Sequence, residues 1–133
     1  GAASPLGAAR EIPHGVVCGT LLAGVTRRSV DFLFNPNSGE GRSLAEGANR
    51  ERAKGKYANA GRILTGSTGA ELEMGRSLVT WLEEMTASAG VGGLGGYGFR
   101  EDELLSLAEK SGNKNQPVHF SPQETAALFL ERL

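Results

Sequence analysis

Apolar side chains recur every three or four residues along much of this 133-residue chain, a spacing that predicts helices. The longest such pattern runs from Gly15 to about Phe34 and gathers its charged residues near the end. Pro13 suits the position just ahead of this helix or in its first turn, and the turn-forming residues 35–39 end it. The apolar positions are Val17, Leu21, Leu22 and Val25.

Two more helices are expected in the middle of the chain, with a short one at 43–49 ahead of them. The first spans 52–64. The second begins with the capping-box spacing Thr-Gly-Ala-Glu at 68–71, in which the threonine hydroxyl and the glutamate carboxylate satisfy each other's free amides. Gly90 suits its C-terminal end. The apolar faces consist of Tyr57, Ala60, Ile63 and Leu64 in the first, and Leu78, Trp81, Leu82 and Met85 in the second.

The last third of the chain is predicted to contain a glycine-rich link, two helices and no strand. The link covers 91–98, a helix covers 101–109, and 111–120 is expected to be a loop. Ser-Pro-Gln-Glu at 121–124 begins the final helix, because serine caps it, proline fits its first position and glutamate completes the box. The apolar run 118–120 is too short to indicate a strand. The pattern as a whole predicts an all-α fold.

Glycine is about twice as frequent as in an average protein. The chain holds 20 glycines, where about 7% is usual. Gly15, Gly19, Gly24 and Gly75 interrupt patterns that are otherwise helical, and each costs up to about 1 kcal/mol relative to alanine inside a helix. We interpret them as positions where two helices approach each other closely.

Charge and cysteine content narrow the class of protein. The formal net charge is −1, with basic and acidic residues interleaved, so neither nucleic acid nor a membrane is expected as a partner. The longest apolar stretch, 16–25, is about half as long as the roughly twenty residues of a membrane span. The N-terminus lacks the pattern of a signal peptide. The single cysteine, Cys18, is expected to be a small buried side chain, and a cytoplasmic location is expected.

Two motifs are candidates for chemistry. Residues 93–98 match the spacing of a dinucleotide-binding fingerprint, but the element predicted before them is a helix and not the strand that this mechanism requires, so a flexible interhelical loop is favoured. His14 lies between proline and glycine at a helix start, where an imidazole can reach a metal ion. One histidine cannot supply the three or four ligands of a metal site, and the other histidine, His119, has no such context.

Several segments resemble the iron-containing alcohol dehydrogenase family. Ser-Pro-Leu-Gly-Ala at 4–8, followed by Ile-Pro-His-Gly at 12–15 and two leucines at 21–22, is similar to the second half of the family signature. The resemblance covers nearly the whole chain and is specific at 4–15. Weaker likenesses are Lys-Tyr-Ala at 56–58 with Arg-Ile-Leu at 62–64, and the loop and helix start at 113–117 and 121–124.

The resemblance implies the C-terminal helical-bundle part of a dehydroquinate synthase-like fold. Residues 1–133 would form a single partial helical domain, with the N-terminal nucleotide-binding domain absent. Family members hold NAD(P) and divalent iron or zinc between two such domains, and one aspartate and three histidines bind the metal. His14 matches the last of these histidines, and the preceding one would fall just before Gly1. The chain would then keep one ligand of four and bind neither cofactor tightly.

Two further positions bear on catalysis and substrate. Ser4 stands where many family members have a histidine near the nicotinamide, and a serine cannot act as a base at neutral pH without help, which puts a proton relay through Ser4 in doubt. The segment that contains Gly112, Asn113 and Asn115 matches a loop that approaches the substrate pocket. A plain surface turn is an equally good interpretation of this segment.

The predicted function is that of a C-terminal fragment of a metal-dependent NAD(P) alcohol dehydrogenase. The intact enzyme would transfer hydride between a small alcohol or aldehyde and the nicotinamide, with the metal as a Lewis acid. The fragment alone is expected to be inactive, and a missing N-terminal half or a partner chain would complete it. The alternative is a non-catalytic helical module that self-associates through apolar faces, for example as a homodimer.

Overall fold

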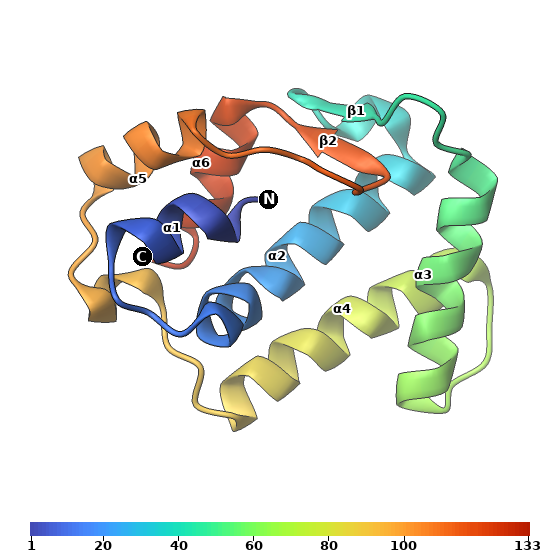
Figure 1. Ribbon diagram of the computed structural model, residues 1–133. Helices are drawn as coiled ribbons and strands as arrows, with labels where there is room; N and C mark the ends of the chain where they lie inside the picture. Colours follow the sequence, from blue (N-terminus) through green and yellow to red (C-terminus); the bar gives the residue numbers. More distant parts are fainter.

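Six α-helices and one two-stranded antiparallel sheet make up the computed structural model, which describes all 133 residues (Figure 1). This confirms the predicted, mainly helical class. The helices are α1 (Ala3–Ala9), α2 (His14–Phe34), α3 (Arg50–Thr65), α4 (Glu71–Ser88), α5 (Glu101–Glu109) and α6 (Pro122–Leu130); the strands are β1 (Arg42–Leu44) and β2 (Val118–Phe120); two short 3-10 turns are η1 (Pro36–Ser38) and η2 (Leu94–Tyr97).

The long helix α2 is the centre of the arrangement. Figure 1 shows it crossing the middle of the molecule, with α3 and α4 on one side and α1, α5 and α6 on the other. It begins after Pro13, as the sequence predicts, and its buried residues lie on more than one face. A helix with neighbours on both sides has no single apolar stripe.

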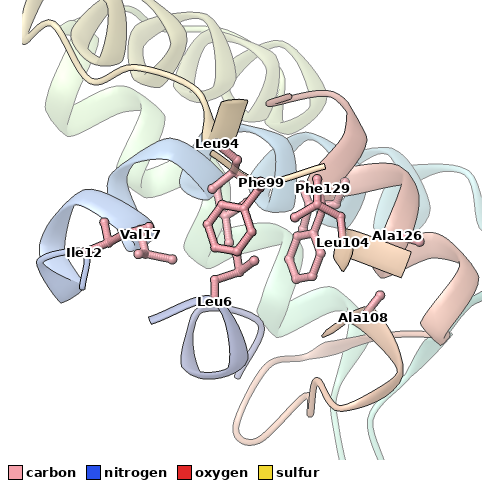
Figure 2. Packing of buried hydrophobic residues seen from close by; sticks show 11 residues of the cluster. Leu6, Ile12, Val17, Leu94, Phe99, Leu104, Ala108, Ala126 and Phe129 are labelled. Carbon is pink, nitrogen blue, oxygen red and sulfur yellow. The ribbon is translucent and has the colours of Figure 1, made fainter. Parts of the chain in front are cut away.

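The main core lies between α1, α2, α5 and α6. Figure 2 shows Leu6 of α1, Val17 of α2, Leu104 of α5 and Phe129 of α6 converging there, and all four are fully buried. A second, smaller cluster lies at the other end of α2, where Phe32 and its neighbours pack against β2 and α3. These two clusters fix the orientation of α2 and therefore the place of its first residue, His14.

Close helix packing explains some of the glycines but not all. A side chain at Gly24 would meet Leu128 Cδ1 of α6, and one at Gly75 would meet Val30 of α2. The tightest approach is at Gly61, where an added Cβ would overlap the backbone carbonyl of Met74 on α4. The interpretation is confirmed at Gly24 and Gly75. At Gly15 it is wrong, because that position faces open space, and at Gly19 a Cβ would make ordinary contacts with Val91.

A partly buried ion-pair network joins α2, β1 and α6. Oε1 of Glu124 accepts hydrogen bonds from Arg28 Nε at 2.7 Å and from Arg42 Nη2 at 2.8 Å. Arg28 also donates through Nη1 to Glu131 at 2.7 Å. The predicted N-cap of α6 is confirmed, since Ser121 Oγ accepts from the Glu124 N–H. The other half of that capping box is not formed, because the Glu124 carboxylate binds the arginines instead.

Two predictions about secondary structure are wrong, and both concern the sheet. Residues 43–49 form no helix, and 118–120 form a strand: Arg42 pairs with Phe120 and Leu44 with Val118. Asn113 supports β2 from the side, because its Oδ1 accepts from the Phe120 N–H at 2.8 Å and its Nδ2 donates to the Phe120 carbonyl at 3.1 Å. Three-residue strands leave no periodic signal, so only the pairing reveals them.

The remaining differences concern helix ends and faces. The short helix α1 was not predicted, and α4 begins at Glu71 without a side-chain cap, so the capping box at 68–71 is not formed. On α3 the predicted apolar face is only partly right, because Tyr57 packs against the second cluster but Ile63 is 80% exposed, while Ala58 and Gly61 are buried. The close approach of α4 requires small residues at the contact. Met85 of α4 is likewise exposed.

Candidate metal-binding site

His14 is the first residue of α2 and lies at the surface. The buried side chain of Ile12 anchors the segment before it in the main core. Pro13 then caps the helix in an extended conformation, with ψ at 131°, and its carbonyl accepts from the Val16 N–H at 2.9 Å. This geometry holds the imidazole at a defined point on the surface, accessible to a ligand.

Cys18 lies beside His14, and the prediction that it is buried is wrong. The thiol is exposed, and its Sγ is 3.3 Å from His14 Nε2. The two residues are four apart on one helix, the spacing at which side chains on one face meet. This spacing is visible in the sequence and would have identified the pair. Imidazole nitrogen and thiolate sulfur are both ligands for zinc and related metals.

His14 and Cys18 are the extent of this cluster within the chain. No three His, Cys, Asp or Glu side chains come together anywhere in the structure in a way that could hold a metal ion. Ser4 is exposed on α1, held by the fully buried Leu6 two residues later. No hydrogen bond links Ser4 with His14.

The predicted substrate-pocket loop divides into residues with different surroundings. Gly112 is exposed, and the side-chain amide of Asn113 is bonded through both its Oδ1 and its Nδ2 to the Phe120 backbone. Asn115 lines a cavity between α2, α3 and α4, together with His119. Neither Ser4 nor His14 lines this cavity. The structure therefore does not bring the predicted site residues together in one place.

The glycine-rich link between α4 and α5 is an interhelical loop, as favoured from the sequence, with the short turn η2 inside it. Leu94 is 1% exposed and belongs to the main core. Added side chains at Gly93 and Gly95 would overlap the backbone at the C-terminus of the chain, near Arg132 and Leu133. These glycines allow the two segments to pack closely.

One titratable group near the cavity is perturbed. Burial raises the pKa of Tyr57 above its usual 10.0, and a hydrogen bond with Ser29 opposes the rise. The phenol is therefore neutral at physiological pH and keeps a proton to donate.

None of the helices is long and apolar enough to cross a membrane.

The chain matches a known protein in its fold, but no family model or curated protein matches its sequence. Among solved structures, the chain is similar to that described as "Crystal structure analysis of 1,3-propanediol oxidoreductase", with a TM-score of 0.72 and 22% identity. The match covers 99% of this chain and 31% of that chain. The chain thus has the fold of about one third of that oxidoreductase, in agreement with the fold that the sequence resemblance implied.

Proposed function

We propose that this chain is the helical, metal-binding C-terminal part of an alcohol dehydrogenase of the iron-containing family. The observation that carries the proposal is the fold shared with 1,3-propanediol oxidoreductase over 99% of the chain. The signature-like segments are consistent with it, because residues 4–8 lie on α1 and the proline–histidine pair begins α2. The N-terminal nucleotide-binding domain would belong to the rest of the enzyme.

The residues present fit one part of a metal site. His14 offers an exposed imidazole at a helix start. The Cys18 thiol lies 3.3 Å from it but is not part of the one-aspartate, three-histidine set that the family resemblance implies. A tetrahedral site takes four ligands, so the others would come from outside these 133 residues. The chemistry supplied in the intact enzyme would be Lewis-acid activation of an alcohol oxygen and hydride transfer to NAD(P).

This chain's own residues would hold the metal and orient a hydroxyl or water, and they would not transfer protons. His14 would hold the metal. Ser4 would orient a hydroxyl or water by hydrogen bonding, because a serine does not act as a base at neutral pH without a neighbouring base. Asn115 lies at a cavity wall, whereas the Asn113 amide is occupied by β2.

Metal analysis of the purified chain tests the proposal. After incubation with Zn²⁺ or Fe²⁺ and desalting, we expect well below one equivalent of metal, and we expect His14→Gln to abolish the residual binding. His119→Gln is the matched control and should leave it unchanged. A monomer that retains one equivalent tightly, or binding that survives His14→Gln, contradicts the assignment. A histidine encoded immediately ahead of Gly1 would support it independently.

The alternative, a self-associating helical module, is favoured by one observation. Ile63 on α3 is 80% exposed, and Leu64 beside it is 42% exposed. A stable homodimer in sedimentation equilibrium, without metal or nucleotide and dissociated by Ile63→Glu, would support this function. A monomer at all concentrations would exclude it.

A further inference from the structure

The cavity between α2, α3 and α4 has the properties of a small-molecule site. Its volume is about 850 Å³, within the range of known ligand pockets. Leu22 of α2, Tyr57 of α3 and Leu78 of α4 supply apolar walls, and Leu22 is 49% exposed, so the cavity opens to solvent. Leu22 is eight residues after His14, roughly 12 Å along the helix axis. The cavity is therefore a separate place from the proposed metal ligand.

The rim of the cavity is positively charged. Arg52 and Lys56 from α3 and Lys114 from the loop before β2 all line it, and none of the three makes an ion pair. The one acidic residue in the lining is Glu46. Lys114 is also the only non-glycine residue with a positive φ, at 36°. Such strained conformations gather at ligand-binding sites.

We propose that this cavity binds a small amphipathic carboxylate. Its apolar body would lie against Leu22 and Leu78, and its carboxylate would meet the cations of the rim. This inference uses neither His14 nor Ser4, but Asn115 of the predicted substrate-pocket loop also lines the cavity.

Isothermal titration of the full chain with octanoate, 1-octanol and octylamine tests the charge requirement. We expect octanoate to bind most tightly and octylamine least. The double variant Arg52→Gln/Lys56→Gln should weaken octanoate about tenfold, the scale expected from losing two exposed charge interactions, and should change 1-octanol binding by less than about twofold. Arg76→Gln, an exposed cation on α4 outside the cavity, is the matched control.

Equal affinity for octanoate, 1-octanol and octylamine overturns the proposal, as does octanoate binding that is unchanged in the double variant. A ligand-free dimer that buries Leu22 in the contact with a second copy also overturns it.

Discussion

Replacing Glu124 with glutamine should destabilise the fold by about 3 kcal/mol. One oxygen of this carboxylate serves Arg28 and Arg42, and the three side chains are only 13%, 9% and 15% exposed, respectively. Removing one partner of a buried ion pair costs about 3–5 kcal/mol, because the other charge is left without compensation. Glu131 still pairs with Arg28 in the variant, which places the loss at the low end of that range.

Urea unfolding at pH 7, followed by circular dichroism, measures the loss. We expect a lower midpoint with an unchanged slope and a melting temperature lower by roughly 10 °C for a domain of this size. Glu109→Gln removes the same charge from an exposed position that makes no ion pair, and it should change stability by less than about 0.5 kcal/mol. If Glu124→Gln is no less stable than Glu109→Gln, the network between α2, β1 and α6 does not hold the fold together.

Two further predictions concern packing and pH. Gly61→Ala places a methyl group against the Met74 carbonyl and should lower the free energy of unfolding by about 1–3 kcal/mol. Gly55→Ala on the same helix meets little and should raise it by up to about 1 kcal/mol. If urea unfolding shows Gly61→Ala to be the more stable variant, the close approach of α3 and α4 is contradicted. Burial alone would raise the pKa of Glu131, but the hydrogen bond and charge of Arg28 lower it below its usual 4.5. A carboxyl whose folded pKa is lowered stabilises the fold above its unfolded pKa and loses that contribution as the pH falls through the folded value. Glu131→Gln should therefore flatten the fall of the urea midpoint below about pH 4.5, and identical slopes for both proteins would refute this assignment.

Most of the helices could be predicted from the sequence because their signals are local, although the short helix α1 could not. The predicted helix 101–109 coincides with α5, and the one that begins near Gly15 coincides with α2 to within a residue. The sheet could not be predicted, because β1 and β2 are three residues long and far apart in the chain. Their stability comes from pairing and from the Asn113 side chain, which bonds to β2.

The candidate site was only partly accessible from the sequence. The sequence points to His14 as a candidate ligand through its proline and glycine neighbours and through family resemblance, and this remains a prediction. Cys18 was misjudged because a free cysteine is most often buried, although its spacing from His14 places both on one face of α2. The cavity could not be foreseen, because its walls come from three helices and a loop, and only the tertiary fold brings Leu22, Arg52 and Gln116 together.

The misassigned face of α3 bears on which function is right. Hydrophobicity selects Ile63 as a core residue, yet the helix buries Ala58 and Gly61 instead, because α4 approaches too closely for larger side chains. A helix that packs through small residues leaves its large apolar residues outside, and such residues in a larger protein are covered by another surface. The surface around Ile63 would be covered either by the rest of a dehydrogenase or by a second copy of this chain. If the rest of the enzyme covers it, Ile63→Glu leaves the isolated chain monomeric and unchanged in stability. If a second copy covers it, Ile63→Glu dissociates a dimer.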